Sequence, residues 1–599
     1  MTCGEAIGLV GGAGAPLMVA GMLLAAQSGA GAGLELDIRH TFNGEPLLLD
    51  SLRYRNAAAE TLSVTRLSYL LSGFALERED GSWLEFTNDA AWIDAGRSRT
   101  AIRLDGVLPG AYRSICFHVG LGTNLNHADS STFGPAHPLN PNLNGLHWSW
   151  QGGYVFLAME GLYRAGATGT LQGYSYHLAR EPNRTRINLP AQLELSEDTT
   201  VLLDFNLGAL LNAPQPLSFE QDGQSTHSRD GDPVAAALVA NLPGAFRVRQ
   251  IDRAAPAAPR VAAASPLYLP AHFTPYRFQT SAAFPIPDLP RDNPLTEERV
   301  VLGRKLFQDT ALSRDGTISC ASCHQEGAGM ADSRRLSLGV RGQSGTRHAM
   351  PLINLAWKSS FFWDGRAPSL RAQALMPIQD HTEMDQSLTN VAAKLAASKD
   401  YPGLFAAAFG APEVTPEKIG LALEQFGLTL TSFDSRFDQA MRGETRLGAE
   451  ERRGLELFMT EYDPRTRQYG ADCFHCHGGP LFSDCQFHNN GLGVDEADLG
   501  RFKVTARAAD RGKFATPSLR NVALRAPYMH DGRFRTLEEV VEHYATGVKR
   551  SPTLDPNLAK HPDGGVPLSA ADKRALVAFL KALTDEKFAP KPTEVSQAP

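Results

Sequence analysis

Two short segments of this chain carry the same pattern of cysteine and histidine. The sequence reads "CASCH" from residue 320 and "CFHCH" from residue 473, so the two copies lie 153 residues apart. Two thiols at this spacing can each add to a haem vinyl group, and the histidine that follows can ligate the iron. A zinc or redox cysteine pair would not explain the trailing histidine in both copies. The pattern therefore predicts two covalent c-type haems, held by Cys320, Cys323, His324, Cys473, Cys476 and His477.

The composition is that of an ordinary globular protein. The chain has 599 residues, of which 43% are hydrophobic and 21% charged, and this length suggests roughly three to five domains. With 58 Lys+Arg against 65 Asp+Glu, the net charge is −7 and no basic run is present, which argues against a nucleic-acid partner. Seven cysteines are too few for a disulfide scaffold. We expect Cys116 and Cys485 to be buried free thiols.

Residues 1–33 are typical of an export signal. An apolar stretch from Ala6 to Ala26 precedes small residues, and the segment around Gly31 is a candidate cleavage site. A signal peptide normally carries Lys or Arg before its apolar stretch, whereas this segment has Glu5 and neither of them. A misassigned start codon and a weak membrane anchor are therefore alternatives to a cleaved signal. No other run approaches the roughly 18–20 apolar residues of a spanning helix. We expect a periplasmic protein without an integral membrane domain, which agrees with haem attachment outside the cytoplasm.

Residues 34–251 have the alternation and turn signals of β-structure. The segments "FALERE" and "SWLEF" flank Asp80-Gly81, a hairpin signal, and further short strand-like runs follow between Gly, Asn and Pro clusters. Such a series predicts an all-β sandwich or barrel-like domain. Residues 252–284 are rich in Ala and Pro without apolar periodicity, which predicts a linker.

The apolar period becomes helical after about residue 285. Thr415 and Pro416 are an N-cap and a first-turn proline, and apolar residues follow at helical spacing as far as Phe437. Ser569 and Asp572 resemble a capping box before another amphipathic stretch. The chain is therefore predicted to be multidomain, with a β-rich front and a helical back.

Five segments of the back half resemble the bacterial di-haem cytochrome c peroxidase family, which includes the MauG-type enzymes. They are "LSRDGTISCASCH", "FFWDGRA", "PIQDHTEM", "GGPLFSDCQFHNNGLG" and "TPSLRNVALRAPYMHDGRFRTLEEVVEHY". The resemblance implies two mainly α cytochrome c-like domains. Residues 285–443 would hold the peroxide-reacting haem on His324, residues 444–590 would hold the electron-transfer haem on His477, and 591–599 would be a tail.

The resemblance assigns roles by position. Trp363 matches a tryptophan that relays electrons between the haems, Glu383 matches the distal acid that moves a proton on peroxide, and Gln373 matches a distal-pocket glutamine. The family's inter-haem calcium would use backbone carbonyls such as those of Arg525 and Pro527. Where some relatives supply Asn to this ion, the chain has His348. We expect His348 and His381 to be structural or surface residues.

Tyr544 is the discriminating position. The resemblance implies a sixth ligand to the second haem iron here, Met in ordinary di-haem peroxidases and Tyr in MauG-type enzymes. A phenolate is a hard anionic donor that stabilises oxidised iron. The alternative is that Tyr544 only packs in a helix. The ligand interpretation shifts the expected substrate from peroxide alone toward a protein side chain oxidised at a distance.

The front half resembles the MbnP-like family of exported copper-binding proteins over about residues 34–250. The matching stretches are "LDIRHTFNGEPLLLDSLRYRN", "LSVTRLSYLLSG", "HPLNPNLNGLHWSWQGGYVFLAMEG" and "YSYHLARE". The resemblance implies copper, with His40 and His177 as the first candidate ligands and His147 as the next. MbnP is encoded beside a MauG-like partner, MbnH, which oxidises an MbnP tryptophan to kynurenine. Trp148 and Trp150 are the candidates here, and sequence does not choose between them.

Together these features predict an exported di-haem enzyme that uses hydrogen peroxide to oxidise a Trp of its own N-terminal domain. A first alternative is a conventional cytochrome c peroxidase, which would take its electrons from a small electron-transfer protein. A second is a copper carrier whose haems only pass electrons.

Overall fold

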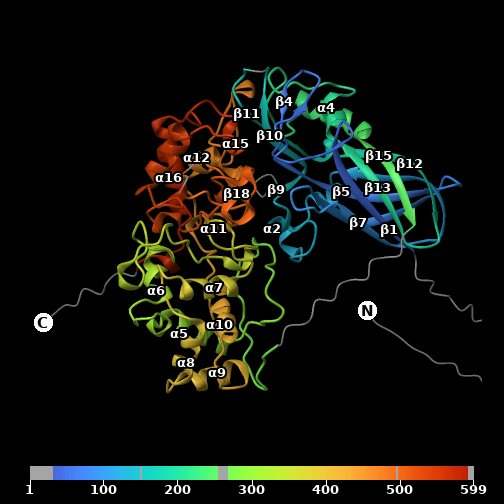
Figure 1. Cartoon of the computed structure of the whole chain (residues 1–599). Coiled ribbons are helices and arrows are strands. Elements are labelled where there is room, and N and C mark those ends of the chain that lie inside the picture. Colours follow the sequence, from blue (N-terminus) through green and yellow to red (C-terminus); the bar gives the residue numbers. More distant parts are fainter. Residues whose placement is uncertain are drawn as a thin grey trace, which may run out of the picture.

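The computed structural model describes residues 32–148, 152–166, 168–253, 267–493, 495 and 497–590. A β-rich half lies beside a helical half, and the two halves meet along one face (Figure 1). The predicted export segment lies outside the described residues except for Ala32 and Gly33, which begin the first strand. The predicted tail, 591–599, also lies outside them. Within the described part of the chain, no helix has the length and apolar character needed to cross a membrane.

The β-rich half consists of two sheets. The smaller sheet contains β1 (Ala32–Phe42), β2 (Glu45–Pro46), β7 (Ala101–Val107), β13 (Thr199–Asn206) and β15 (Phe246–Arg253). The larger sheet contains β3 (Tyr54–Arg55), β4 (Thr61–Leu62), β5 (Arg66–Arg78), β6 (Trp83–Asp94), β8 (Gly110–Val119), β9 (His147–Trp148), β10 (Gly153–Arg164), β11 (Gln172–Ala179), β12 (Thr185–Leu195) and β14 (Ser225–Thr226). Neighbours are mostly antiparallel, whereas β1 and β13 run parallel.

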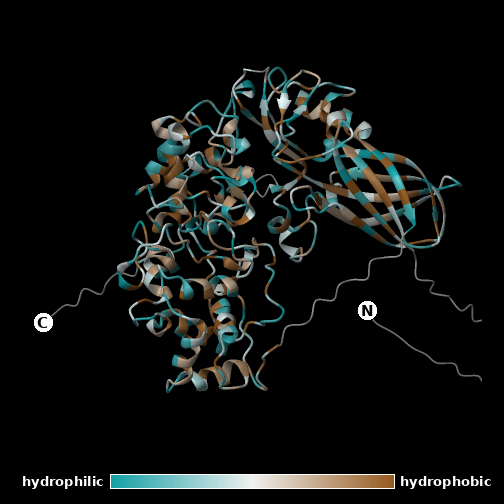
Figure 2. Ribbon diagram, viewed as in Figure 1, coloured by the Kyte–Doolittle hydropathy of each residue, from teal (hydrophilic) through white to brown (hydrophobic). Residues whose placement is uncertain are grey.

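Alternating side chains explain these strands. Along β12, buried and exposed residues alternate from Thr185 to Leu195 without interruption, and Figure 2 shows apolar and polar residues alternating along the strands. The hairpin predicted at Asp80-Gly81 is confirmed, because β5 and β6 pair antiparallel on either side of it. One apolar core lies between the two sheets and includes residues of α3 (Leu207–Asn212) and α4 (Pro233–Ala245). The predicted β-domain is therefore confirmed.

The first domain of the helical half surrounds the first cysteine motif. Its helices are α5 (Glu297–Gln308), α6 (Cys320–Cys323), α7 (Leu370–Gln379), α8 (Leu388–Ala396), α9 (Tyr401–Phe409), α10 (Pro416–Leu428) and α11 (Arg436–Met441). The predicted start of α10 is confirmed, since the Thr415 side chain accepts the backbone N–H of Lys418. Helices α5 and α10 pack together around one core.

The predicted continuation of this helix to Phe437 is wrong. Helix α10 ends at Leu428, and Phe437 belongs to the separate helix α11. The Thr429 hydroxyl donates to the carbonyl of Phe426 at 2.7 Å, so it competes for a helix acceptor. Asn354 then pairs with the backbone of Ser432 in both directions. Tertiary hydrogen bonds therefore replace helical ones, although the apolar spacing continues.

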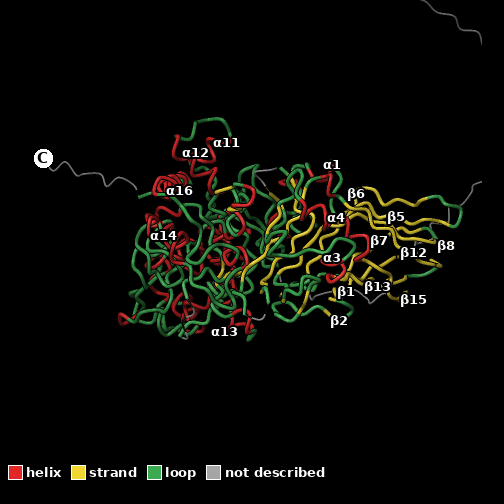
Figure 3. The backbone as a smooth tube through the Cα atoms, turned by 90° about the horizontal axis from the view of Figure 1, so that it is seen from above, coloured by secondary structure: helices red, strands yellow, loops and turns green. Residues whose placement is uncertain are grey.

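The second domain surrounds the second motif and is richer in loops. Its helices are α12 (Ala449–Phe458), α13 (Phe502–Thr505), α14 (Leu537–Glu542), α15 (Pro556–Ala559) and α16 (Ala570–Ala582), with short strands β16 (Tyr462–Asp463), β17 (Gln468–Tyr469), β18 (Phe487–His488) and β19 (Phe514–Ala515). Ser569 caps α16 as predicted, because its side chain accepts the Asp572 N–H. Figure 3 shows how much loop surrounds these helices.

The second part of the predicted linker packs against the first helical domain. The rings of Phe278 and Phe284 contact Trp357, with centroids 5.7 and 5.0 Å away, and the Trp357 indole donates to the carbonyl of Pro285 at 2.7 Å. Residues 254–266 lie outside the described residues. The segment that enters the helical half is therefore anchored by aromatic packing rather than being a plain spacer.

The two halves are in direct contact through β10 and β11, which lie against α15. Figure 1 shows these strands next to α15. At Gly173 on β11 two backbones approach closely, because a Cβ there would lie 1.9 Å from the carbonyl oxygen of Pro556 and 2.8 Å from the backbone nitrogen of Lys560. Only a residue without a side chain fits between these two backbones.

We therefore expect Gly173→Ala to loosen the contact between the halves. The added methyl group would clash with backbone atoms, and only an opening of the interface removes this clash. We expect the change to destabilise the docked state by about 1–3 kcal/mol. Small-angle scattering should show a larger radius of gyration and calorimetry a separate, earlier transition. Gly134→Ala is the matched control, since nothing lies within 4 Å of its Cβ position. Identical scattering and melting for both variants would contradict the close approach.

Candidate functional site

A cavity lies against each cysteine motif. The first, of about 650 Å³, is lined by Cys320, Cys323 and His324 and, among other residues, by Gln373 and Glu383. The second, of about 210 Å³, is lined by Cys473, Cys476 and His477 together with Tyr544. In each case the thiols and the histidine of one motif face a single space, as covalent attachment of a flat cofactor requires.

The histidine of each motif is oriented by a backbone carbonyl. Nδ1 of His324 lies 3.1 Å from the carbonyl oxygen of Met330, and Nδ1 of His477 lies 3.1 Å from that of Phe482. Burial lowers the pKa of both imidazoles, that of His477 to about 4. Each ring is therefore neutral, with Nε2 left to ligate iron. The residues present fit two covalently attached haems.

Trp363 lies between the two cavities and lines both. It is buried, and its indole N–H donates to the carbonyl oxygen of His348 at 2.8 Å. His348 also lines both cavities and is 5% exposed. We expected it to be a structural or a surface residue, and its burial shows that it is not a surface residue. A tryptophan fixed in the shared wall is placed to pass an electron from one cavity to the other.

Glu383 and Gln373 both reach the first cavity, as expected. Burial raises the pKa of Glu383 to about 7, and Asp380 adds to the effect. A carboxyl group that titrates near neutral pH can both accept and return a proton. His381, three residues before Met384, is instead an exposed residue whose ring lies 3.7 Å from Asp380, in agreement with its expected surface role.

Tyr544 reaches the second cavity from a π-helical turn, His543–Gly547, that continues α14. Asn490 donates to its hydroxyl at 3.3 Å, and burial raises its pKa to about 12. π-Turns recur at functional sites. Met529 also lines this cavity and accepts from Asn490 through sulfur at 3.5 Å. The ligand role of Tyr544 stays a prediction, as does calcium, although Arg525, Pro527 and His348 all line this cavity.

The second motif also meets the β-rich half. Trp148 on β9 stacks on the ring of His227, with centroids 5.3 Å apart, and crosses His177 at 6.0 Å. His227 in turn contacts Phe474 at 5.8 Å and His475 at 5.1 Å. Phe474 and His475 are the two residues between the cysteines of the second motif. Trp148 is therefore joined to that motif by a short series of ring contacts.

A buried ion network surrounds these rings. Glu461 lies 2.5 Å from Nδ1 of His227 and 2.9 Å from Nζ of Lys560, which is also 2.9 Å from Asp472. Although burial opposes the effect, His227 and Lys560 hold the pKa of Glu461 well below its ordinary value. Charges buried this deeply are tolerated only when they are paired. The contact between the halves is therefore electrostatically specific.

The structure separates the expected copper ligands. His40 lies between the sheets, where its Nε2 is 2.9 Å from the Tyr69 hydroxyl. His177 pairs with Ala158, beside the Leu157 that pairs with Tyr69, so it points from the opposite face of the larger sheet. His40 and His177 are therefore not brought together. His147 does line a cavity with Trp148 and His177, whereas Trp150 lies outside the described residues.

Sequence reasoning missed His227 and His475, which the structure does bring to His177. Each is an isolated histidine in the sequence, and only the folding of β14 and the second motif against β11 places them together. The signal that was available is His475, the histidine between the two cysteines of "CFHCH", because a residue at that position is not needed for haem attachment. Cys116 is buried as expected, and Cys485 is half-buried; both are free thiols.

Comparison with known proteins separates the two halves in the same way. Residues 297–446 match the family described as di-haem cytochrome c peroxidase, and residues 31–228 match the MbnP family. A methylamine utilization protein MauG from Methylorubrum extorquens is 40% identical over 304 residues, which is 50% of this chain and 82% of that protein. A cytochrome c551 peroxidase from Pseudomonas aeruginosa is 34% identical over 324 residues, 52% of this chain and 86% of that protein.

Among solved structures, a MauG-like protein associated with microbial copper homeostasis is 34% identical. The match covers 53% of this chain and 98% of that one, with a TM-score of 0.48. The two relatives above are each matched over most of their length, and the residues of both motifs face cavities that fit haem. The chain therefore belongs to the di-haem cytochrome c peroxidase family that includes MauG, as an oxidoreductase with an MbnP domain at its front.

Proposed function

We propose that this chain is an exported di-haem peroxidase that uses hydrogen peroxide to oxidise Trp148 of its own MbnP domain to kynurenine. The observation that carries the proposal is the position of Trp148. It is 7% exposed and lies one ring, His227, away from Phe474 of the second haem-attachment motif. A substrate side chain held there is already docked, so oxidation within one chain requires no encounter between molecules.

Bound haem would supply the chemistry that turns hydrogen peroxide into oxidising equivalents. In the first cavity, Glu383 can accept a proton from one peroxide oxygen and return it to the other, because its pKa of about 7 makes both transfers accessible at neutral pH. Gln373 lines the same cavity and can orient the peroxide. Trp363, in the wall shared by the two cavities, can relay an electron between them.

The conversion of Trp148 is a balanced reaction. Two hydrogen peroxide molecules deliver one oxygen atom each to C2 and C3 of the indole, break the bond between those atoms and leave as water. Hydrolysis then releases C2 as formate. Kynurenine carries a carbonyl and an aryl amine, which would lie beside His177 and His227 and add donors for copper. The maturation would thus prepare the copper-binding site expected of an MbnP domain.

A conventional peroxidase is the second candidate, supported by the 34% identity with a cytochrome c551 peroxidase. In that case electrons would come from a small electron-transfer protein. Tyr544 separates the candidates, since a Met ligand suits such electron transfer and a phenolate favours oxidation of a protein side chain. A pure copper carrier is disfavoured by membership of an enzyme family.

We expect the rate of reaction with hydrogen peroxide to rise with pH through about 7 and then level off. Glu383 must be ionised to accept the peroxide proton, and its raised pKa places that change near neutrality. Stopped-flow absorbance between about pH 5 and pH 9 measures this rate. We expect Glu383→Gln to lower the rate by about 10²–10⁴-fold and to remove its increase with pH. The exposed Glu326→Gln is the control. A rise that persists in Glu383→Gln would assign the proton transfer to another group.

We expect Trp363→Phe to leave peroxide consumption nearly intact but to slow the oxidation of Trp148 by on the order of tenfold, about 1.4 kcal/mol of barrier. Phenylalanine keeps an aromatic ring but is harder to oxidise and lacks the N–H bonded to His348. Stopped-flow absorbance and product analysis follow the two rates. Trp357→Phe is matched, because Trp357 is buried in the same domain and donates to Pro285. If both variants slow the oxidation of Trp148 equally, Trp363 has only a packing role.

Peptide mass spectrometry tests the proposal itself. In holoprotein treated with hydrogen peroxide, we expect Trp148 to gain one oxygen atom and lose one carbon atom overall. Trp92 is an internal control, since this buried indole donates to Ser68 inside the same half and should stay intact. His324→Ala should leave Trp148 unmodified. Intact Trp148 in active wild-type protein would favour the conventional peroxidase, and modification of Trp150 alone would reject the assigned residue.

A further inference from the structure

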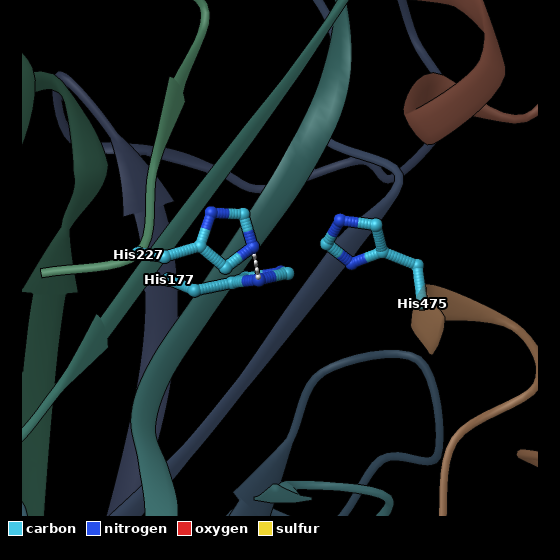
Figure 4. A group of neighbouring side chains, drawn as sticks. All are labelled: His177, His227 and His475. Carbon is cyan, nitrogen blue, oxygen red and sulfur yellow. Dashed lines mark hydrogen bonds between the residues drawn. The ribbon is translucent and has the colours of Figure 1, made fainter. Parts of the chain in front are cut away.

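Three histidines with buried side chains, from both halves of the chain, face one another. His177 lies on β11, His227 follows β14, and His475 lies in the second haem-attachment motif, at the end of the short helix Cys473–His475. One ring nitrogen of each lies within 4.8 Å of the others, and Figure 4 shows the three rings gathered around one space. We infer that these histidines bind one copper ion, for which the haem-attachment motif provides the third ligand.

One ring nitrogen of each of the three histidines contacts a carboxylate. Nε2 of His177 lies 2.9 Å from Glu160, Nδ1 of His227 lies 2.5 Å from Glu461, and Nε2 of His475 lies 2.9 Å from Asp472. The nitrogens left for a shared ion are Nδ1 of His177, Nε2 of His227 and Nδ1 of His475. Histidines that ligate metals almost always donate the N–H of their other ring nitrogen in a hydrogen bond, for example to a carboxylate or a backbone carbonyl. The same arrangement occurs here three times.

The spacing of the nitrogens suits a metal. Nδ1 of His177 and Nε2 of His227 are 3.3 Å apart. Two nitrogens bound at about 2.0–2.1 Å in tetrahedral geometry would be about 3.3 Å apart. The side chains are only 3–6% exposed, so water does not screen the site. A cavity of about 70 Å³, lined by Trp148, His177 and His475, adjoins the cluster and provides room for a fourth donor.

The charges around the site are paired with one another. The carboxylates of Glu160, Glu461 and Asp472 face three cations: Arg66 lies 2.9 Å from Glu160, Lys560 lies 2.9 Å from both Glu461 and Asp472, and Arg229 lies 3.9 Å from Glu461. The choice of metal therefore follows from the three imidazoles, and imidazole is a suitable ligand for copper. The inference rests on the copper binding proposed for the MbnP domain, but not on oxidation of Trp148.

Such a site would exist only while the halves are docked. His177 and His227 come from the β-rich half, and His475 comes from the second haem domain. Bound copper would therefore stabilise the contact between them, as any ligand stabilises the state that binds it. The site would also hold copper beside Trp148, where a kynurenine carbonyl could complete the ligand set.

Copper titration of the untreated holoprotein tests the inference. Cu(I) added in competition with a chromogenic chelator should bind at one ion per chain, and His475→Asn and His227→Asn should each weaken binding by at least about 100-fold, close to 2.7 kcal/mol. His272→Asn, an exposed histidine of the segment between the halves, should bind as the wild type does. Haem content measured by absorbance verifies that the variants keep both haems.

X-ray absorption at the copper edge of the wild type is a second measurement that needs no variant. Three imidazole ligands support the site, whereas two imidazoles, or unchanged affinity in His475→Asn, overturn it in favour of a site within the β-rich half. The peroxide experiment fails independently: if Trp148 stays intact while three imidazoles bind copper, the proposed function fails and this inference stands.

Discussion

The docking of β11 against the second haem-attachment motif is the contact on which the functional arrangement depends. It buries the side chains of Glu461, Asp472 and Lys560 together with those of His177, His227 and His475. Removing these charges from water carries a large penalty that only close pairing offsets. A shift of the interface would leave a carboxylate or an ammonium group unpaired, so the network favours one relative position of the halves. Gly173, pressed against the backbone of Pro556, allows that position to be reached.

Apolar packing connects the same interface to the second cavity. Leu162 of the β-rich half packs with Val548, Leu554 and Ala559, and Tyr544 contacts this cluster. The residue proposed as iron ligand therefore lies between the cavity and the docked domain. Packed interiors transmit small displacements because they contain little free volume. The position of the β-rich half and the environment of Tyr544 are thus mechanically linked.

Electron transfer and proton transfer are assigned to different parts of the helical half. Glu383 is in the first cavity and titrates near neutrality because burial penalises its charge. Trp363 lies in the wall that both cavities share, and Trp148 lies beyond the second motif. The order of these groups along the molecule is proton-handling site, relay, second motif and candidate substrate. A long-range oxidation requires such a series, since the oxidised residue does not touch the peroxide site.

The sequence by itself determined the covalent and local features of this protein. Haem attachment follows from the spacing of two thiols and a histidine, and strands such as β12 follow from strict alternation, because both depend on neighbours in the chain. Tertiary structure decided the rest. The apolar spacing after Leu428 continues, yet Asn354 ends the helix by pairing with Ser432. His40 and His177 share a residue type, but His40 lies between the two sheets and His177 points from the opposite face of the larger sheet, whereas His227 and His475, far apart in sequence, meet at the interface. Proximity across hundreds of residues leaves no periodic signal in one sequence, so only the docked fold reveals it.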